Sequence, residues 1–276
     1  MKVLSLFDGI SCGMVALKRA GIPVAKYYAS EIKSIATKVS NKNYPKIIRL
    51  GNILDINGSD LPKIDLLIGG SPCQDLSGLK ADTRQNLKGE KSKLFFEYLR
   101  ILKEVNPTYF LLENVKMAKD SQDQISLLLG VHPIRINSNL VSYQNRDRLY
   151  WTNIPEITQP KDLNISFQDN KSVNDLEKYK VNKTPSRIKM WDYQCPNITD
   201  RKKINCLTRK QDRWANAGLI EYQDFCRYLT VEECEKAQTL PVGYTNCLTK
   251  NQSYDVLGDG WTVDVIAHIL SHMKEV

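Results

Sequence analysis

One apolar run with an abrupt end constrains the fold of this chain more than any other feature. Residues 64–68 form a short, continuous apolar stretch between turn residues, which is typical of a buried strand. The sequence Gly-Gly-Ser-Pro-Cys-Gln follows at 69–74, where glycine allows a positive φ and proline cannot donate to a sheet. Cys73 is therefore expected on a tight turn at the carboxyl edge of a strand, where open α/β sheets bind ligands. A thiol there is a candidate nucleophile, although many free cysteines are only small buried apolar residues.

Further strand and helix patterns place this run in a doubly wound α/β domain. Residues 3–7 predict a first strand, and a glycine-containing turn leads into a helical pattern over 14–20. The remaining predicted elements are strands at 23–30, 46–50 and 109–112, two strands within 132–152, and helices at 94–105, 230–239 and 263–270. Strands that alternate with helices in this way predict a mostly parallel sheet with helices on both faces.

The composition indicates a folded chain with a polyanionic partner. Hydrophobic residues make up 42% of the 276 residues, and no apolar run approaches the ~18 residues of a membrane span. The formal charge of +8 and a pI of about 9.0 favour nucleic acid, although a basic surface can also lack a specific partner. Seven cysteines without C-x-x-C spacing predict neither a disulfide framework nor a zinc site. Together with the lack of a signal-peptide pattern, they favour a reducing cytoplasm.

Acidic residues follow three of the predicted strands. Glu31 ends the second strand, where a carboxylate suits hydrogen bonding to ribose hydroxyls, and Asp55 could accept from an adenine amino group. Glu113 follows the strand at 109–112 and is expected at the same edge as Cys73. Apolar neighbours could keep its carboxyl group protonated and able to donate to a base. Each of these residues also fits an ordinary role as a helix or turn cap.

Two polar segments lie near these strand ends in the sequence. Gln144, Arg146 and Arg148 alternate along a predicted strand, so their side chains are expected on one face. That face suits an anionic or carbonyl-rich ligand, although a solvated edge strand has the same pattern. The basic segment 79–93 lacks apolar periodicity and is long for a connection, which predicts a lid over the site.

Residues 156–225 predict a small second lobe with a basic and aromatic face. Apolar periodicity fades there, and the stretch 187–213 holds eight basic residues against three acidic ones. Trp191, Tyr193 and Trp214 lie among these charges. Positive charge suits phosphates and planar rings suit bases, so we expect the lobe to contact nucleic acid, although a solvated insertion has a similar composition. Residues 1–155 and 226–276 would then form the other domain.

Taken together and in this order, the motifs resemble those of the DNA (cytosine-5) methyltransferase family. The matching segments, in chain order, are Phe7-Asp8-Gly9 with Gly13, the Pro-Cys-Gln loop at 72–74, Glu113-Asn114-Val115, the Q-x-R-x-R motif at 144–148, and residues 227–244 before the last helix. Gln74 and the short lobe are similar to bacterial and phage members with a single catalytic domain. The closing segment 258–263 departs from the usual Gly-Asn-Ser/Ala-Val form.

The resemblance implies a Rossmann-like class I methyltransferase domain, with a mixed doubly wound sheet and a small target-recognition lobe. It also implies S-adenosyl-L-methionine as the methyl donor and no metal. The implied cofactor residues are Phe7, Asp8, Gly9, Gly13, Glu31, Ile32, Asp55, Ile56, Trp261 and Val263. The implied catalytic residues are Cys73, Glu113, Arg146 and Arg148. The residues expected to contact the substrate are Gln74, Ser77, Gln144, Arg209 and Arg213.

The reaction implied by the resemblance proceeds through a covalent adduct. The Cys73 thiolate would add to C6 of a cytosine flipped out of double-stranded DNA, C5 would take the methyl group, and S-adenosyl-L-homocysteine would remain. Such a protein would serve restriction-modification or phage DNA protection, as a monomer in the cytoplasm of a bacterial or phage-infected cell. Two alternatives remain open: an inactive DNA-binding homologue, and a tRNA cytosine-5 methyltransferase. The latter branch is expected to carry a Cys-Phe-Thr triplet, which this chain lacks.

Overall fold

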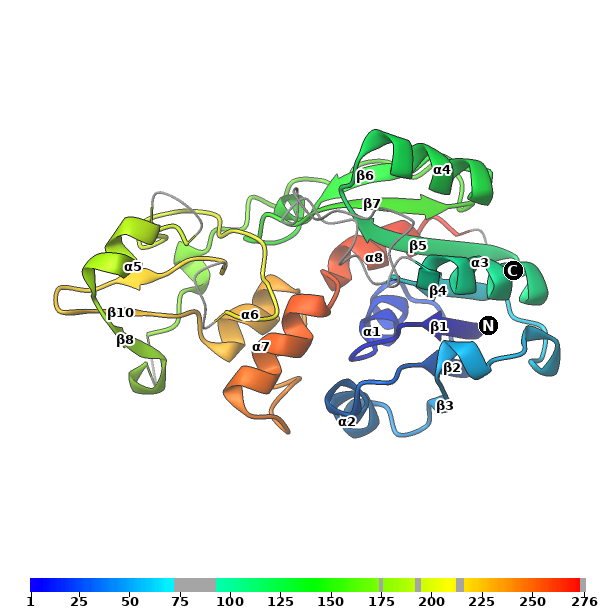
Figure 1. Cartoon of the computed structure of the whole chain (residues 1–276), viewed down its shortest axis with the longest axis horizontal. Helices are drawn as coiled ribbons and strands as arrows, with labels where there is room; N and C mark the ends of the chain where they lie inside the picture. The colour runs from blue at the N-terminus through cyan, green and yellow to red at the C-terminus, as the bar shows by residue number, and fades with distance from the viewer. Residues whose placement is uncertain (72–92, 174–175, 192–194, 212–215, 274–276) are drawn as a thin grey trace.

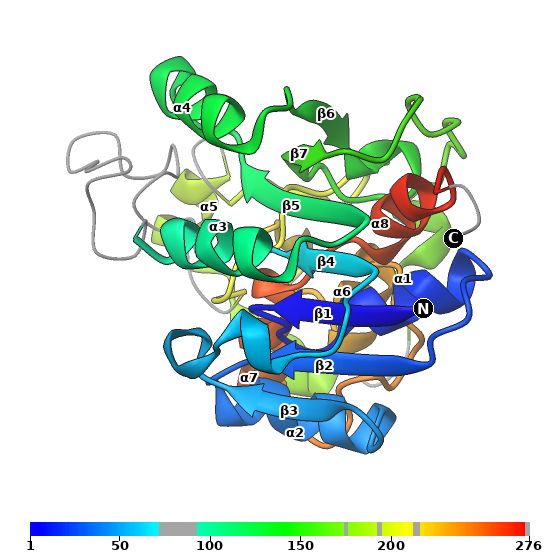
Figure 2. The same ribbon diagram turned by 90° about the vertical axis from the view of Figure 1, so that its right-hand side faces the viewer.

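The computed structural model describes residues 1–71, 93–173, 176–191, 195–211 and 216–273. Its centre is a seven-stranded sheet of order β3-β2-β1-β4-β5-β7-β6 (Figures 1 and 2). The strands are β1 (Lys2–Leu6), β2 (Lys26–Ser30), β3 (Ile48–Gly51), β4 (Leu66–Gly69), β5 (Tyr109–Val115), β6 (Ile134–Asn137) and β7 (Asp147–Thr152). The first five strands pair in parallel, whereas β7 runs antiparallel to both β5 and β6. This mixed, doubly wound sheet confirms the predicted fold class.

Helices cover both faces of the sheet because successive strand residues point to opposite sides. In β1, Val3 belongs to one buried apolar cluster and Leu4 to the other. The first cluster takes in α1 and α8, and the second takes in α3 and α4 (Figure 2). The helices are α1 (Cys12–Arg19), α2 (Ser34–Asn43), α3 (Lys93–Val105), α4 (Lys119–Leu129), α5 (Pro185–Met190), α6 (Val231–Ala237), α7 (Lys250–Asp259) and α8 (Val263–Leu270). Among the described helices, none is both long and apolar enough to cross a membrane.

Two strand boundaries differ from the prediction, and both differences arise from β7. β5 continues to Val115, so that Glu113 lies inside the strand, because β7 pairs along it as far as Val115 opposite Arg148. β7 itself begins only at Asp147, so that Gln144 precedes the strand and forms an isolated bridge to Ile204. The sequence pattern placed residues 144–148 in one strand, because alternation does not show where pairing stops.

The C-terminal helices follow their capping signals. The predicted capping box is confirmed at α6, where Thr230 and Glu233 each accept from the other's backbone N–H. The predicted apolar stripe of the last helix is confirmed in α8, where Val263, Ile266 and Leu270 are fully buried. The sequence interpretation missed α7, although Thr249 and Gln252 form the same kind of box at its start.

The second lobe lies to one side of the sheet domain, with α6 and α7 between them (Figure 1). Its sheet is antiparallel, in the order β8 (Lys180–Asn182), β10 (Phe225–Arg227) and β9 (Ile220–Glu221). β10 extends two residues past the expected lobe boundary at 225. It ends at Arg227, which is fully buried and forms a 2.8 Å ion pair with Glu233 of α6. This ion pair connects the lobe to the C-terminal helices.

Candidate active site

The turn between β1 and α1 forms a strained loop at the carboxyl edge of the sheet. Phe7, Gly9 and Ser11 all have left-handed backbone conformations, with φ values of 57°, 58° and 62°. Only glycine adopts this region freely, so the surrounding contacts must hold the other two residues in place. A side chain on Gly9 would find no described atom within 4 Å. The loop is therefore both held in place and open on its outer side.

The carboxyl group of Asp8 supports this loop from beneath. It accepts hydrogen bonds from the hydroxyl groups of Ser11 and Tyr27, and the Arg49 guanidinium lies 3.7 Å away. Burial raises the pKa of Asp8, although these partners oppose the shift. Asp8 was predicted to contact a cofactor, but the structure turns its side chain into the protein, where it stabilises the loop.

Glu31 reaches across from the end of β2 to the same loop. One carboxylate oxygen accepts from the Gly9 N–H at 2.8 Å, and the other accepts from the N–H groups of Ile32 and Lys33. The Ile32 side chain is 73% exposed beside it. An acceptor, an exposed apolar side chain and open space above Gly9 together fit an adenosyl group, whose ribose is polar and whose base is flat and apolar on its faces.

The other predicted cofactor residues divide into exposed and buried ones. Asp55 is exposed in a short 3₁₀ turn after β3, whereas the Ile56 side chain is buried. Gly13 lets α1 approach the sheet, because a β-carbon there would lie 2.4 Å from a methyl group of Ile68. Val263 was predicted to contact the cofactor, but its side chain is fully buried at the start of α8 and forms part of the core.

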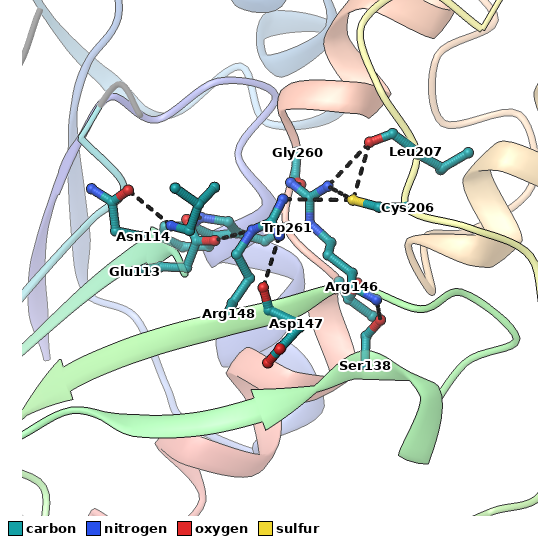
Figure 3. A network of polar contacts seen from close by, with 12 residues as sticks. Glu113, Asn114, Ser138, Arg146, Asp147, Arg148, Cys206, Leu207, Gly260 and Trp261 are labelled. Carbon is teal, nitrogen blue, oxygen red and sulfur yellow. Dashed lines mark hydrogen bonds and ion pairs between the residues drawn. The ribbon is translucent and has the colours of Figure 1, made fainter. Parts of the chain in front are cut away.

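Glu113 is held by one donor on each carboxylate oxygen (Figure 3). The Arg148 Nε lies 3.0 Å from Oε1, and the Trp261 indole N–H donates to Oε2 at 3.1 Å. The carboxyl group is buried, with 8% of the residue exposed. Each carboxylate oxygen of Glu113 therefore has one partner from a distant part of the chain.

Arg146 and Cys206 close these contacts into a ring. Arg146 donates to the Gly260 carbonyl at 2.8 Å and approaches the Cys206 sulfur at 3.3 Å, and Arg148 approaches the same sulfur at 3.6 Å. We call Glu113, Trp261, Arg146, Cys206 and Arg148 the polar ring (Figure 3). Burial by itself raises the pKa of Cys206, but the two guanidinium groups outweigh it, and the net shift is downward.

The predicted nucleophile turn begins beside this ring. The Asn114 side-chain amide donates to the Ser71 hydroxyl at 3.0 Å, two residues before Cys73. A β-carbon on Gly70 would lie 3.0 Å from both Glu113 Oε2 and Trp261 Nε1. The predicted site residues Cys73, Gln74, Ser77 and Arg213 lie outside the described residues, as does all of the predicted lid except Lys93.

Gln144 and Arg209 both bind other groups of the protein, although the Arg209 side chain is partly exposed. Gln144 is fully buried, donates to the Ala237 carbonyl and accepts from the Leu207 N–H at 2.8 Å. It therefore supports the segment that carries Cys206, whereas it was predicted to contact the substrate. Arg209 was predicted to contact DNA, and here its guanidinium pairs with Asp255 of α7 at 2.6 Å.

Cys206 was missed by the sequence interpretation. It opens the triplet Cys-Leu-Thr at 206–208, which differs from Cys-Phe-Thr only in its central apolar residue. A search that allowed either apolar residue would have found it. Its proximity to Arg146 and Arg148, however, depends on a contact between distant segments that no local pattern reports.

The mixed seven-stranded sheet, the glycine turn after β1 and the polar ring define a Rossmann-like methyltransferase domain. Solved structures share this fold over nearly their whole length. The Entamoeba histolytica methyltransferase EhMeth has a TM-score of 0.81 at 18% identity, with 99% of this chain and 97% of that one covered. The S. pombe Dnmt2 methyltransferase has a TM-score of 0.73 at 20% identity, with 98% and 97% covered.

The sequence comparisons match the first part of the chain to one family. Residues 1–130 match the C-5 cytosine-specific DNA methylase family. The orphan methyltransferase M.SPRI of Bacillus phage SPR is 29% identical over 98% of this chain and 58% of its own length. The type II methyltransferase M.FnuDI of Fusobacterium nucleatum is 32% identical over 60% of this chain and 49% of its own length. The chain thus spans about half the length of these relatives, and the family match covers its residues 1–130.

Proposed function

We propose that this chain is a DNA cytosine-5 methyltransferase that acts through a covalent Cys73 adduct on a cytosine flipped out of the duplex. The observation that carries the proposal is the position of Gly70 and Ser71, which precede Cys73 in the chain, against Glu113 and Asn114. The family match of residues 1–130 and the names of the phage and bacterial relatives, which are orphan and type II methyltransferases, also support it.

The proposed chemistry assigns a separate task to each residue. C5 of cytosine is a weak nucleophile, and addition of the Cys73 thiolate to C6 makes it enamine-like. Glu113 hydrogen-bonds N3 and the exocyclic amine of the base, while Arg148 binds O2 and keeps its contact with Glu113. Once C5 has taken the methyl group, its proton would pass to water and the bond between C6 and the Cys73 sulfur would break. This restores the ring double bond and the thiolate, and a thiol suits both addition and departure. The base must leave the stack before any of these groups can reach it.

The cofactor in this proposal is S-adenosyl-L-methionine, which supplies an electrophilic methyl group when bound. Gly9 provides open space, Glu31 accepts from a ribose hydroxyl, and Ile32 covers a face of the adenine. Glu31 already accepts three backbone hydrogen bonds, and its four lone-pair positions leave room for one more. The protein's part is to bind and orient this group beside the polar ring.

Double-stranded DNA is the proposed partner, with residues 156–225 as the target-recognition lobe and the remainder as the catalytic domain. The formal charge of +8 and the basic stretch 187–213 support a phosphate contact. The names of the relatives support a role in restriction-modification or in protection of phage DNA, in the cytoplasm of a bacterial or phage-infected cell. A monomer fits a single lobe that reads one site.

Transfer of tritiated methyl groups from S-adenosyl-L-methionine to duplex DNA tests the proposal. We expect wild-type protein to label DNA, and Cys73→Ser to lose turnover while it still binds DNA. A fully active serine variant would refute the covalent step. A wild type that binds DNA without labelling it would identify an inactive homologue.

A tRNA substrate is the second candidate, because Cys206-Leu207-Thr208 is close to the Cys-Phe-Thr triplet of the tRNA-modifying branch. The same assay with tRNA beside duplex DNA separates the two. We expect DNA to be labelled, since the curated relatives are named as type II and orphan methyltransferases. Labelling of tRNA alone would replace the DNA proposal.

A further inference from the structure

We propose that Trp261 is a positioning residue, whose indole N–H holds the Glu113 carboxylate in the orientation that the base requires. This inference deepens the proposed function and rests on it. It goes beyond the cofactor contact that the resemblance implies for Trp261, because it assigns the indole nitrogen a task toward Glu113.

The two donors on Glu113 come from different parts of the chain and bind different oxygens. Arg148 lies on β7 and reaches Oε1 at 3.0 Å, whereas Trp261 lies between α7 and α8 and reaches Oε2 at 3.1 Å. A single donor would leave the carboxylate plane free to turn about its terminal bond. Two donors on separate oxygens define that plane, which matters because a hydrogen bond to N3 and the exocyclic amine depends on direction.

The backbone that carries Trp261 is itself held from several sides. Arg146 donates to the carbonyl groups of Gly258 and Gly260 at 3.3 and 2.8 Å. The Gln238 side chain donates to the Leu257 and Gly260 carbonyls at 2.6 and 3.0 Å. These contacts fix the segment before the indole, and a donor on a fixed segment loses little side-chain freedom when it binds.

Gly70 shows how closely this hydrogen bond is packed. Its φ lies outside the left-handed region, so its conformation does not require glycine. A β-carbon at this position would nevertheless lie 3.0 Å from Glu113 Oε2 and 3.0 Å from Trp261 Nε1. An alanine here would therefore push against both ends of the same bond while both partner side chains remain in the protein.

The arrangement separates an effect on the chemical step from an effect on cofactor binding, whereas a simple packing role would combine them. Trp261→Phe keeps an aromatic ring and removes the N–H that faces Glu113, together with part of the bicyclic ring. Gly70→Ala keeps the N–H and displaces it. If Trp261 positions Glu113, both variants slow the chemical step, and neither needs to weaken cofactor binding.

The experiment compares single-turnover methylation at saturating cofactor and DNA with the dissociation constant of S-adenosyl-L-homocysteine. We expect Trp261→Phe and Gly70→Ala each to slow the single-turnover rate about tenfold, with the dissociation constant changed by less than about threefold. Trp151→Phe is the matched control, since its indole N–H bonds Ser126 Oγ at 2.9 Å in the core. It should lower the melting temperature and leave the single-turnover rate of the folded enzyme near the wild-type value.

A second readout does not depend on activity. The chain has four tryptophans, so the indole N–H signals of ¹⁵N-labelled protein are few, and Trp261→Phe identifies the one from Trp261. We expect Glu113→Gln to shift that signal. An unmoved signal would overturn the inference. Unchanged single-turnover rates in both variants would also overturn it, as would weaker cofactor binding with a wild-type rate at saturating cofactor and DNA. A wild type that methylates neither DNA nor tRNA would refute the proposed function, while the indole signal would still decide whether Trp261 holds Glu113.

Discussion

The two halves of the carboxyl edge are built in different ways. In the half formed by β1, β2 and β3, the contacts join near neighbours: Glu31 accepts from Gly9 across two adjacent strands and from the next two residues. In the half formed by β5 and β7, the hydrogen bonds join distant residues: Trp261 donates to Glu113 across 148 residues of sequence, and Arg146 donates to Gly260 across 114. The first half depends on backbone conformation, and the second depends on the assembly of distant segments.

The largest expected effect on the free energy of unfolding comes from breaking the ion pair that connects the lobe to α6. Glu233→Ala would leave Arg227 fully buried without its carboxylate, and would also remove an acceptor from the N–H groups of Ser172 and Thr230. We expect a loss of about 3–5 kcal/mol in the free energy of unfolding, measured in urea.

Glu232→Ala is the matched control, because Glu232 pairs with Lys236 on the exposed face of the same helix. Its loss should cost only about 0.3–0.5 kcal/mol. Equal effects for the two variants would show that the connection between the lobe and α6 does not depend on this buried contact.

The next prediction tests the half formed by β1, β2 and β3, in which the contacts are local. Glu31→Ala removes the acceptor proposed for a ribose hydroxyl, and we expect the free energy of cofactor binding to weaken by roughly 1.5–3 kcal/mol. Isothermal titration with S-adenosyl-L-homocysteine measures it. An unchanged dissociation constant would contradict the ribose assignment, and would leave Glu31 as a support for the Gly9 loop alone.

Two glycines offer the sharpest contrast between the halves. A β-carbon on Gly258 would lie 2.2 Å from the Thr208 carbonyl carbon, so Gly258→Ala must displace backbone, and we expect a loss of about 1–3 kcal/mol in unfolding free energy. Gly9→Ala meets no described atom and suffers only from its left-handed φ, at about 1–2 kcal/mol.

The two variants should also differ in what they disturb, as single-turnover rates and cofactor titration would show. Gly258→Ala should slow the chemical step, because residues 206–208 hold Cys206 in the polar ring. Gly9→Ala should mainly weaken cofactor binding. If the two variants shared one profile, the division of the edge into a local and an assembled half would be wrong.

The same division explains how much the sequence could predict. Gly9 and Glu31 were placed correctly at one edge, because consecutive parallel strands bring their ends together whatever the rest of the chain does. The inward turn of Asp8 was not predictable, since a motif does not show which way a side chain points. The contacts of Trp261 and Cys206 were not predictable either, because the periodicity of a sequence does not show which distant segments pack together.

The most direct test of the central claim uses duplex DNA in which the target cytosine is replaced by 5-fluorocytosine. Fluorine cannot leave C5 as a proton does, so an adduct that normally decays is trapped and can be mapped by mass spectrometry. We predict a cofactor-dependent adduct on the peptide that contains Cys73, formed more slowly by Glu113→Gln. An adduct on Cys206, or normal methylation of cytosine with no trapped adduct at all, would contradict the account.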